Sequence, residues 1–229
     1  MTVTSRCVSA PKVKAYEEGV GRPLTPEEFV VYTARLSNPG NQHSHETADR
    51  LIDYLIKHKH WSPFEMVNIT MEINTTRDIA RQVLRHRSFS FQEFSQRYAD
   101  PTKELGFTVR EARLQDHKNR QNSIETSDVE LEAWWDAQQK FIREQVSRVY
   151  SEAIDKGIAK EQSRAVLPEG MTQSNMFMQG SLRSWIHYIE LRAGVETQKE
   201  HRQIARDAAI EVIQDFSFLK PRWKEMGVI

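Results

Sequence analysis

The sequence predicts an α+β fold, because most of its ordered segments have the pattern of amphipathic helices and one has the pattern of a strand. Residues 66–75 carry apolar side chains at every second position, as expected for a strand with one buried face. Several other segments carry apolar residues three and four positions apart and are bounded by helix start or stop signals. The length of 229 residues suits one sizeable core, so we expect a single domain over residues 1–229.

Two helices are predicted in the first quarter of the chain. Thr25, Pro26 and Glu28 have the pattern of a capping box with proline at the first helical position, and 38–40 (Asn-Pro-Gly) supplies a stop. The second helix is predicted by a stripe of apolar residues, which are Ala48, Leu51, Ile52 and Leu55.

Three further helices are predicted in the second half. A long helix begins near Ser127 and ends before Gly157, with Leu131, Trp135, Ile142, Val149 and Ala153 at helical spacing. Another has a core stripe of Leu182, Trp185, Ile186 and Ile189, which leaves Arg183 and His187 together on a different face. Thr197 and Glu200 are expected to cap the last one, whose core face is Ala205, Ala208, Ala209, Val212 and Phe216.

Strand candidates are fewer. The best is 66–75, with Val67, Ile69, Met71 and Ile73 on one face. Residues 94–98 and 107–113 are expected to pair nearby, and residues 116–126 are polar enough to form an exposed loop.

Charge and cysteine content exclude some classes of protein. Lys and Arg total 32, as do Asp and Glu, so the net charge is zero and binding to nucleic acid through bulk electrostatics is not expected. The single cysteine, Cys7, excludes an internal disulfide and fits a reducing compartment. Since residues 1–10 do not resemble a signal peptide and no apolar run is long enough to span a membrane, we expect a cytoplasmic protein that does not bind membranes.

Residues 85–98 (RHRSFSFQEFSQRY) concentrate polar side chains suited to chemistry. A helix is predicted to start at Thr75 to Asp78, with Ile79, Ala80, Val83 and Leu84 buried, so that Gln82, Arg85 and His86 share a separate face. The segment that follows should be extended, which would direct Glu93, Ser95 and Arg97 to the same side. These side chains would then converge on one polar surface.

That polar surface allows two interpretations. Guanidinium forks suit phosphate oxygens, a serine hydroxyl adds a donor, and a glutamate accepts from a sugar hydroxyl or a base N–H, as in a nucleotide monophosphate site. Alternatively, the arginines complement a helix C-terminus and pair with Glu93. The residue types and spacing leave both interpretations open.

The same segment resembles the signature of the flavin-dependent thymidylate synthases, RHRxxSxNExSxR. The matching residues are Arg85, His86, Arg87, Ser90, Glu93, Ser95 and Arg97, and the one departure is Gln92, where the pattern has Asn. Residues 60–65, 163–168, 181–187 and 191–193 are similar to further segments of this family.

The resemblance implies an antiparallel β-sheet packed with a helical bundle, as the subunit of a homotetramer with shared active sites. It also implies the reductive methylation of dUMP to dTMP, with methylenetetrahydrofolate as carbon donor, FAD as cofactor and NADPH as reductant. By resemblance, dUMP is bound by Gln82, Arg85, Glu93, Ser95, Gln96, Arg97, Arg164 and Arg192, the last of which is also the catalytic residue. FAD is bound by Ser62, Glu65, Arg85, His86, Arg87, Glu93, Ser181, Arg183 and His187.

Proteins of other classes offer alternative interpretations of these residues. A single-stranded nucleic-acid module would use the aromatic rings of 85–98 as stacking platforms between arginines; those rings are Phe89, Phe91, Phe94 and Tyr98. A zinc enzyme would use the pairs His43/His45 and His58/His60, but a spacing of two suits a helical face poorly and no third ligand is evident, so no metal is expected.

Thymidylate synthesis can also proceed through a cysteine thiolate, and Cys7 is the only candidate. It lies outside every segment that resembles a ligand site, with no neighbouring His or helix start to lower its pKa. We therefore predict a route without a cysteine nucleophile, in which Arg192 stabilises negative charge developing on the pyrimidine.

Overall fold

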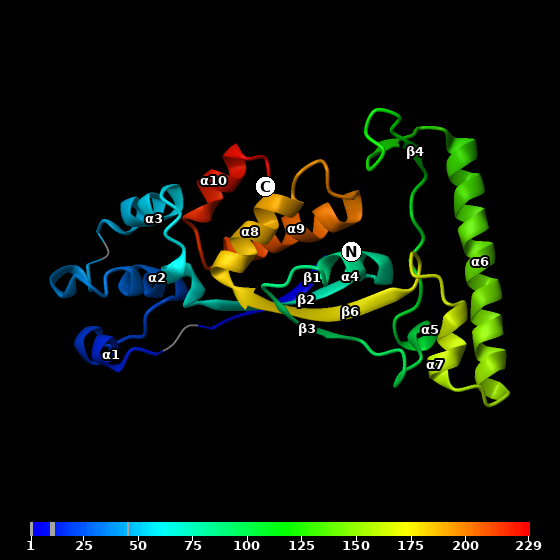
Figure 1. The fold of residues 1–229 in the computed structure, drawn as a ribbon, viewed down its shortest axis with the longest axis horizontal. Coiled ribbons are helices and arrows are strands. Elements are labelled where there is room, and N and C mark those ends of the chain that lie inside the picture. The colour runs from blue at the N-terminus through cyan, green and yellow to red at the C-terminus, as the bar shows by residue number, and fades with distance from the viewer. Residues whose placement is uncertain (1, 10–11, 45) are drawn as a thin grey trace.

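The computed structural model describes residues 2–9, 12–44 and 46–229 and has the predicted α+β architecture. Four antiparallel strands form a sheet in the order β1-β2-β6-β3. The bounds are Thr2–Ser9 for β1, Asn68–Thr76 for β2, Gln173–Ser181 for β6 and Ser90–Glu93 for β3. Figure 1 shows this sheet in the middle of an elongated molecule, with α1 to α3 at one end and α6 at the other.

Ten α-helices and a small hairpin complete the described part of the chain. The helices are α1 (Lys14–Val20), α2 (Pro26–Ala34), α3 (Ala48–Lys57), α4 (Arg77–Val83), α5 (Pro101–Glu104), α6 (Val129–Asp155), α7 (Lys160–Ser163), α8 (Leu182–Arg192), α9 (Lys199–Val212) and α10 (Leu219–Glu225). Three 3-10 helices are η1 (Pro39–Asn41), η2 (Ser62–Glu65) and η3 (Arg164–Val166), and the hairpin pairs β4 (Arg113–Gln115) with β5 (Ser123–Glu125).

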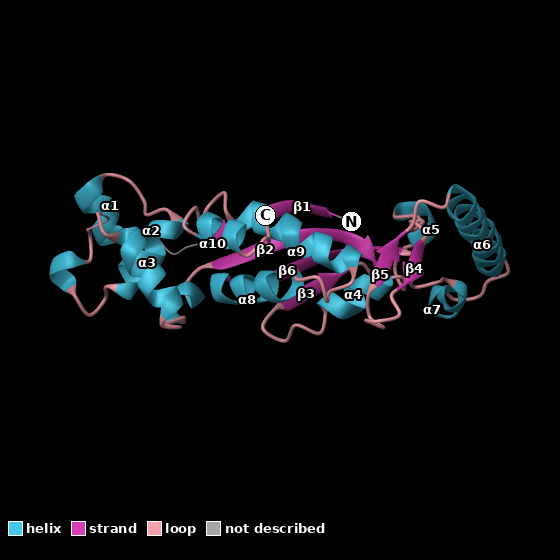
Figure 2. Cartoon of the chain, turned by 90° about the horizontal axis from the view of Figure 1, so that it is seen from above, coloured by secondary structure: helices cyan, strands magenta, loops and turns pink. Residues whose placement is uncertain are grey.

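One face of the sheet forms the core. The predicted alternation in β2 is confirmed, because Ile69, Met71 and Ile73 are fully buried. On the neighbouring strand β6, Met176 and Met178 are buried in the same cluster, together with the apolar faces of α8 and α9. Each such side chain contributes about 1.5–3 kcal/mol by leaving water. Figure 2 shows α4, α8 and α9 lying along the strands, so this core fixes the elements that carry most of the predicted site.

The opposite face of the sheet is polar. Glu72 accepts hydrogen bonds from Asn175 (2.7 Å) and Ser5 (3.0 Å), and Gln179 donates to Asn68 (3.1 Å). These cross-strand contacts satisfy side chains that alternate with the buried ones.

Two strand predictions were wrong. The predicted strand at 94–98 is a turn, in which the Tyr98 N–H donates to the carbonyl of Ser95 (3.1 Å), while the real strand β3 lies immediately before it. Within 107–113, only Phe107 bridges to Thr172, and the strand that forms is β4, at the end of that segment. The predicted loop at 116–126 also contains β5.

More of the helix predictions than of the strand predictions are confirmed. The capping box of α2 is present, and α6 has Asp128 as its N-cap, with Oδ1 accepting from the Leu131 N–H. The predicted cap of α9 by Thr197 and Glu200 is wrong, because α9 starts after Gln198, whose side chain donates to Glu200 (2.9 Å).

Helix α6 stands at the edge of the molecule rather than in the core (Figure 1). Trp134 is 57% exposed and Phe141 is 59% exposed, and Ile142 of the predicted stripe is also largely exposed, whereas the buried residues are Gln139 and Tyr150. Among the described residues, no helix combines the length and apolar character needed to cross a bilayer.

Candidate active site

The signature segment forms the end of α4, a loop and strand β3, and the loop is held against β6 by Phe89. The ring of Phe89 lies so close to Gly180 that a Cβ there would be 2.5 Å from its Cδ1 atom. The same ring packs edge-on against Trp185 of α8, with centroids 5.0 Å apart. A glycine on β6 therefore lets the loop that carries Arg85, His86 and Arg87 lie beside α8.

The C-terminal end of α8 brings Arg192 to His86. The Nε atom of Arg192 donates to Nε2 of His86 at 3.0 Å. Burial and the adjacent guanidinium lower the pKa of His86 to about 4, so the imidazole is neutral at pH 7 and acts as an acceptor. The other guanidinium nitrogens of Arg192 make no hydrogen bond with the described residues, which leaves them available to a ligand.

Three more polar side chains lie behind this pair. His201 is fully buried, with Nε2 3.1 Å from the Tyr188 hydroxyl and Nδ1 3.3 Å from Oε1 of Gln82. Burial, followed by the charge of Arg192, lowers the pKa of His201 to about 3, and burial also raises the pKa of Tyr188. Arg192 is therefore a cation held among neutral rings.

Two of the residues predicted for dUMP, Gln96 and Arg164, line a cavity of about 370 Å³ between α4 and η3. Three guanidinium groups face it, from Arg77, Arg81 and Arg164, together with the side chain of Gln96. Gln96 is only 5% exposed, and its Nε2 atom has no hydrogen-bond partner in the part of the chain that the structure describes. Since buried donors are almost always paired, this amide is suited to an acceptor supplied by a ligand.

The predicted side-by-side arrangement of Glu93, Ser95 and Arg97 is wrong, because the chain turns after Glu93. Glu93 Oε1 instead accepts from Ser174 (2.7 Å) and pairs with Arg77 (3.2 Å). The Ser95 hydroxyl accepts from the backbone N–H of Arg97 (3.4 Å).

Arg97 nevertheless remains close to the cavity, because its side chain pairs with Glu161 (3.3 Å). Glu161 is one of the residues that line the cavity. Glu93 and Arg97 therefore adjoin the cavity through their partners, Arg77 and Glu161.

Five of the residues predicted for flavin gather at the N-terminal end of α8, whereas His86 lies at the C-terminal end, beside Arg192. Ser181 is the N-cap, Arg183 forms an ion pair with Glu65, and the His187 ring lies 4.6 Å from that of Trp61, centroid to centroid. Burial and the charge of Arg183 lower the pKa of His187. Ser62, at the start of η2, is exposed beside this group.

One hydrogen bond connects this end of α8 to the signature loop. The Ser184 hydroxyl donates to the Ser88 carbonyl at 3.3 Å. Arg85 and Arg87, close to Ser88 in the chain, are exposed and form no hydrogen bond or ion pair with any described residue. The predicted flavin residues other than Glu93 thus lie on α8, on η2 and in the loop that crosses α8.

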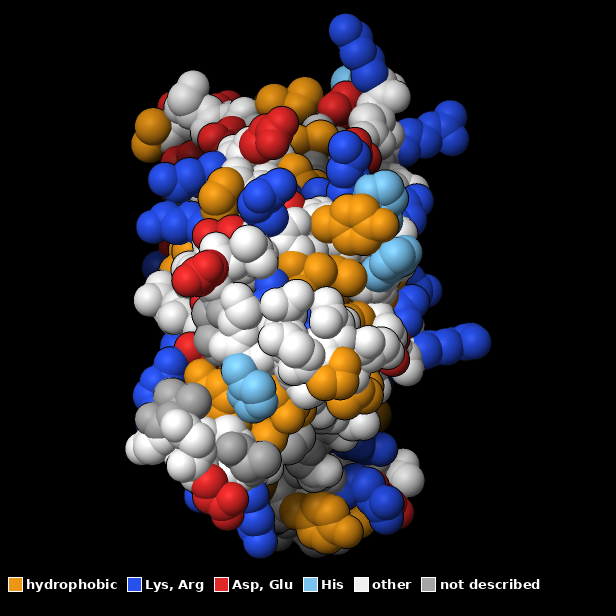
Figure 3. All heavy atoms as spheres, turned by 90° about the vertical axis from the view of Figure 1, so that its left-hand side faces the viewer, with side chains coloured by type: hydrophobic (Ala, Val, Ile, Leu, Met, Phe, Trp, Pro, Cys, Tyr) orange, Lys and Arg blue, Asp and Glu red, His pale blue; other side chains and the backbone are white. Residues whose placement is uncertain are grey.

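The alternative interpretations find little support in this geometry. Of the four rings proposed as stacking platforms, Phe89 is buried, Phe91 and Phe94 are partly buried, and only Tyr98 is exposed. His58 and His60 lie around the ring of Tyr54, at the end of α3, and Figure 3 shows the side of the molecule that carries α1 to α3. His45 lies outside the described residues, within which no three His, Cys, Asp or Glu side chains converge to hold a metal.

Comparison with known proteins decides the family. The profile of the family described as "Thymidylate synthase complementing protein" matches residues 22–216. The chain is 47% identical over 203 residues to the probable flavin-dependent thymidylate synthase of Paramecium bursaria Chlorella virus 1, which covers 89% of this chain and 91% of the relative. It is 49% identical over 185 residues to the flavin-dependent thymidylate synthase of Synechocystis sp., covering 81% and 83% of the two chains.

The chain belongs to the flavin-dependent thymidylate synthase family. Its fold is also similar to that of the UMP/dUMP methylase PolB from Streptomyces cacaoi, solved with 5-Br dUMP, at a TM-score of 0.76 and 24% identity. That likeness covers 99% of this chain and 97% of the other, and it supports the fold assignment.

In this member of the family, sequence reasoning missed several site residues. Arg77 and Arg81 line the cavity, and their i, i+4 spacing immediately before the signature could have indicated a shared face. Tyr188 and His201 had no such signal, because each is an isolated polar residue within a core stripe. Gln92, the departure from the signature, is exposed on β3 opposite Phe177.

Proposed function

We propose that this chain converts dUMP to dTMP by reductive methylation, with methylenetetrahydrofolate as carbon donor, FAD as cofactor and NADPH as reductant. Membership of the family supports the activity, and the observation that carries the site assignment is the arginine-lined cavity containing the unpartnered amide of Gln96. Guanidinium groups and an amide N–H are the donors that a nucleotide phosphate requires.

We propose that this cavity binds the phosphate of dUMP. Arg164 makes no ion pair with the described residues, so its guanidinium is available for bidentate binding. Arg77 is held by Glu93 and Arg81 by Glu169, which keeps both guanidinium groups at the wall of the cavity. Gln96 then donates its buried N–H to a phosphate oxygen.

Arg192 is proposed to act on the pyrimidine. Thymidylate formation requires C5 of uracil to become nucleophilic, and a cation beside N3 and its neighbouring carbonyl favours that by stabilising negative charge. His86 holds the Nε edge of the guanidinium, while the two terminal nitrogens form no hydrogen bond with the described residues. Because His86 is neutral, it does not compete with the substrate for the charge of Arg192.

The residues at the other end of α8 suit FAD. The donor set comprises Arg85, Arg87 and Arg183, which match a pyrophosphate, while Trp61 and His187 offer aromatic surface to a flavin or adenine ring. Ser181 and Ser62 add hydroxyl groups. When bound, FAD supplies the two-electron redox chemistry that reduces the transferred carbon to a methyl group.

We also propose that the enzyme is a homotetramer with shared active sites. Two observations support self-association: α6 exposes Trp134, Phe141 and Ile142 away from the core, and the residues predicted for one site fall into separate groups within one chain. Light scattering coupled to gel filtration tests this proposal, and a monomer at micromolar concentration would contradict it.

The activity is tested with purified, flavin-loaded protein. We expect a yellow protein that forms dTMP when dUMP, methylenetetrahydrofolate and NADPH are all present, and none when any one is omitted. Replacing NADPH by NADH in a parallel reaction tests the reductant. Full flavin occupancy without dTMP formation would contradict the proposed function.

A further inference from the structure

A continuous line of hydrogen bonds runs from α8 through α4 to the β4–β5 hairpin. Oε1 of Gln82 lies 3.3 Å from His201 Nδ1, and Gln82 Nε2 donates to Oε1 of Gln198 at 2.8 Å. Gln198 Nε2 donates to Glu200 Oε2 at 2.9 Å, and the other oxygen of Glu200 accepts from Arg113. The line joins residues that lie far apart in the sequence.

The charged end of this line determines the direction of every hydrogen bond in it. The side chains of Glu200 and Arg113, which are 13% and 11% exposed, form an ion pair, and a carboxylate paired with a guanidinium can only accept hydrogen bonds. Gln198 must therefore turn its NH₂ group toward Glu200 and its oxygen toward Gln82. In turn, Gln82 must donate to Gln198 and present its own oxygen to His201.

The same logic fixes the tautomer of His201. Because the Gln82 oxygen can only accept, Nδ1 of His201 must carry the proton. His201 is neutral, so Nε2 has a lone pair and accepts from the Tyr188 hydroxyl 3.1 Å away. The donor and acceptor in each hydrogen bond of the line are therefore fixed. If the amide of either glutamine were reversed, two acceptor oxygens would face each other.

Gln82 is left with one N–H that none of the described residues accepts. We propose that His201 is a positioning residue, which together with the Arg113–Glu200 ion pair fixes the side-chain amide of Gln82 so that it donates an N–H to an acceptor oxygen of dUMP. This inference rests on the proposed function, in which Gln82 contacts dUMP. In this orientation, the free position of the Gln82 amide is a donor, so it suits an acceptor group of the substrate and not a donor group.

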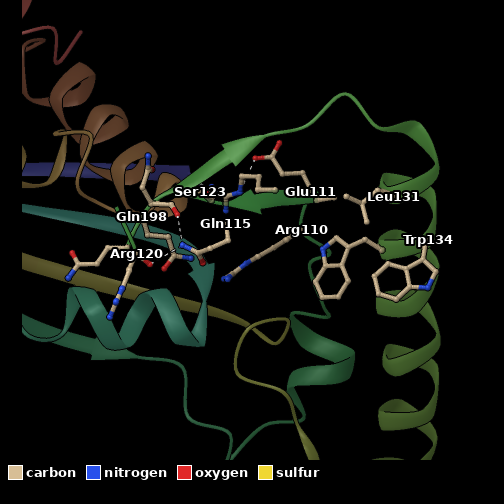
Figure 4. A pocket seen from close by; sticks show the side chains of 13 residues that line it. Arg110, Glu111, Gln115, Arg120, Ser123, Leu131, Trp134 and Gln198 are labelled. Carbon is tan, nitrogen blue, oxygen red and sulfur yellow. Dashed lines mark hydrogen bonds and ion pairs between the residues drawn. The ribbon is translucent and has the colours of Figure 1, made fainter. Parts of the chain in front are cut away.

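The position of the line in the fold fits this role. His201 is fully buried on α9, which packs against both α4 and α8, so it connects the helix carrying Gln82 to the helix carrying Arg192. Figure 4 shows Gln198 on the α9 side of the cavity between the β4–β5 hairpin and α6, near the side chains of Gln115 and Arg120.

The tautomer is tested by nitrogen-15 NMR of the histidine rings in holoenzyme, with His201→Asn used to assign the signals. We expect a proton on Nδ1 of His201 at neutral pH, without any substrate present. A proton on Nε2, or a protonated ring, would overturn the inference. Because this experiment needs no substrate, its outcome does not depend on the proposed function.

The effect on substrate is tested by dUMP titration of holoenzyme variants. His201→Leu removes the donor to Gln82 and should weaken dUMP binding about tenfold, as expected for the loss of one buried hydrogen bond, with KM raised more than kcat is lowered. His201→Asn places an amide N–H near the position of Nδ1 and should restore most of the affinity. Glu200→Gln removes the charge that directs the line and should weaken dUMP several-fold.

The matched control is Gln203→Leu, on the same helix. Gln203 donates to Asp207 at 2.8 Å in an exposed pair on α9 and takes no part in the line, so dUMP affinity should stay within about threefold of the parent. Unchanged dUMP affinity in His201→Leu with full flavin occupancy would overturn the proposal. Failure of the parent protein to bind dUMP would instead contradict the proposed function.

Discussion

The two ends of helix α8 differ in how their polar side chains are held. At the C-terminal end, Arg192 is fixed by a neutral His86, and Tyr188 and His201 close the space behind it. At the N-terminal end, Arg183 lies on the surface, 42% exposed, with only an exposed partner, Glu65. One helix therefore carries a preorganised end and an open end.

This difference in preorganisation indicates which ligand binds at each end of α8. A cation that must stabilise developing charge is most effective when its orientation is set before the substrate arrives and water is kept away. A large cofactor needs an accessible set of donors that it can cover. The exposed ion pair at this end contributes little to stability, so a cofactor that breaks it on binding loses little free energy. This supports the assignment of the C-terminal end to dUMP and of the N-terminal end to FAD.

The largest expected effect comes from breaking the preorganised end. Arg192→Ala should lower the rate of dTMP formation at least about a hundredfold, or roughly 2.7 kcal/mol in the barrier, because it removes the cation that His86 holds at this position. Steady-state kinetics with saturating dUMP measure this loss, with flavin absorbance as a check on the cofactor. A reduction of less than about threefold would remove Arg192 from the chemistry.

Breaking the open end should remove the cofactor instead. The double change Arg183→Ala and His187→Ala should lower FAD occupancy about tenfold while the protein stays folded, because both side chains are partly exposed and neither belongs to the core cluster. The visible absorbance per protein chain measures occupancy. Arg22→Ala, which breaks an exposed ion pair with Glu28 on α2, is the matched control and should keep its flavin. Full occupancy in the double variant would contradict the assignment.

The arginine-lined cavity sharpens the comparison, because it contains a buried donor, Nε2 of Gln96, with no partner among the described residues. Gln96→Leu should weaken dUMP binding about tenfold and leave the melting temperature unchanged or raised, since an unsatisfied buried N–H is itself destabilising. Calorimetry measures the affinity and thermal unfolding the stability. Weaker binding accompanied by a large loss of stability would indicate a structural role.

A smaller effect is expected on stability as the pH falls. His86 and His201 have folded pKa values of about 4 and about 3, below the unfolded value near 6.5. Between pH 6.5 and 5 the unfolded chain therefore binds more protons, and the free energy of unfolding decreases as the pH is lowered. Urea unfolding at several pH values should show this slope, and a shallower one in His201→Asn. Equal slopes would contradict the assignment of the effect to His201.

The sequence predicted the elements whose signal is local. The capping box of α2, the buried alternation of β2 and the core stripe of α8 all follow from side chains close together in the chain. Strand β6 was missed, because its polar positions and Gly180 give a weak strand pattern, although the alternation of Met176 and Met178 could have indicated it. Its central place in the sheet depends on pairing with β2 and β3.

The site was predictable only in part, for the same reason. The resemblance named residues such as Arg192 and His86, but no local pattern shows that the two side chains touch. The turn after Glu93, which separates it from Ser95 and Arg97, arises from backbone hydrogen bonds that an alternating pattern does not reveal. The line through His201 joins four elements, and only the folded chain brings them together.

The central claim, that this chain methylates dUMP without a cysteine nucleophile of its own, is tested most directly by Cys7→Ser. Cys7 is exposed on the edge strand β1, and its cross-strand partner is Thr70. Thr70 lies between the buried residues Ile69 and Met71, so Cys7 lies on the face of the sheet opposite the core. We expect the variant to form dTMP at the parent rate, with full flavin occupancy and an unchanged melting temperature. A folded, flavin-loaded Cys7→Ser protein that forms no dTMP would contradict the account.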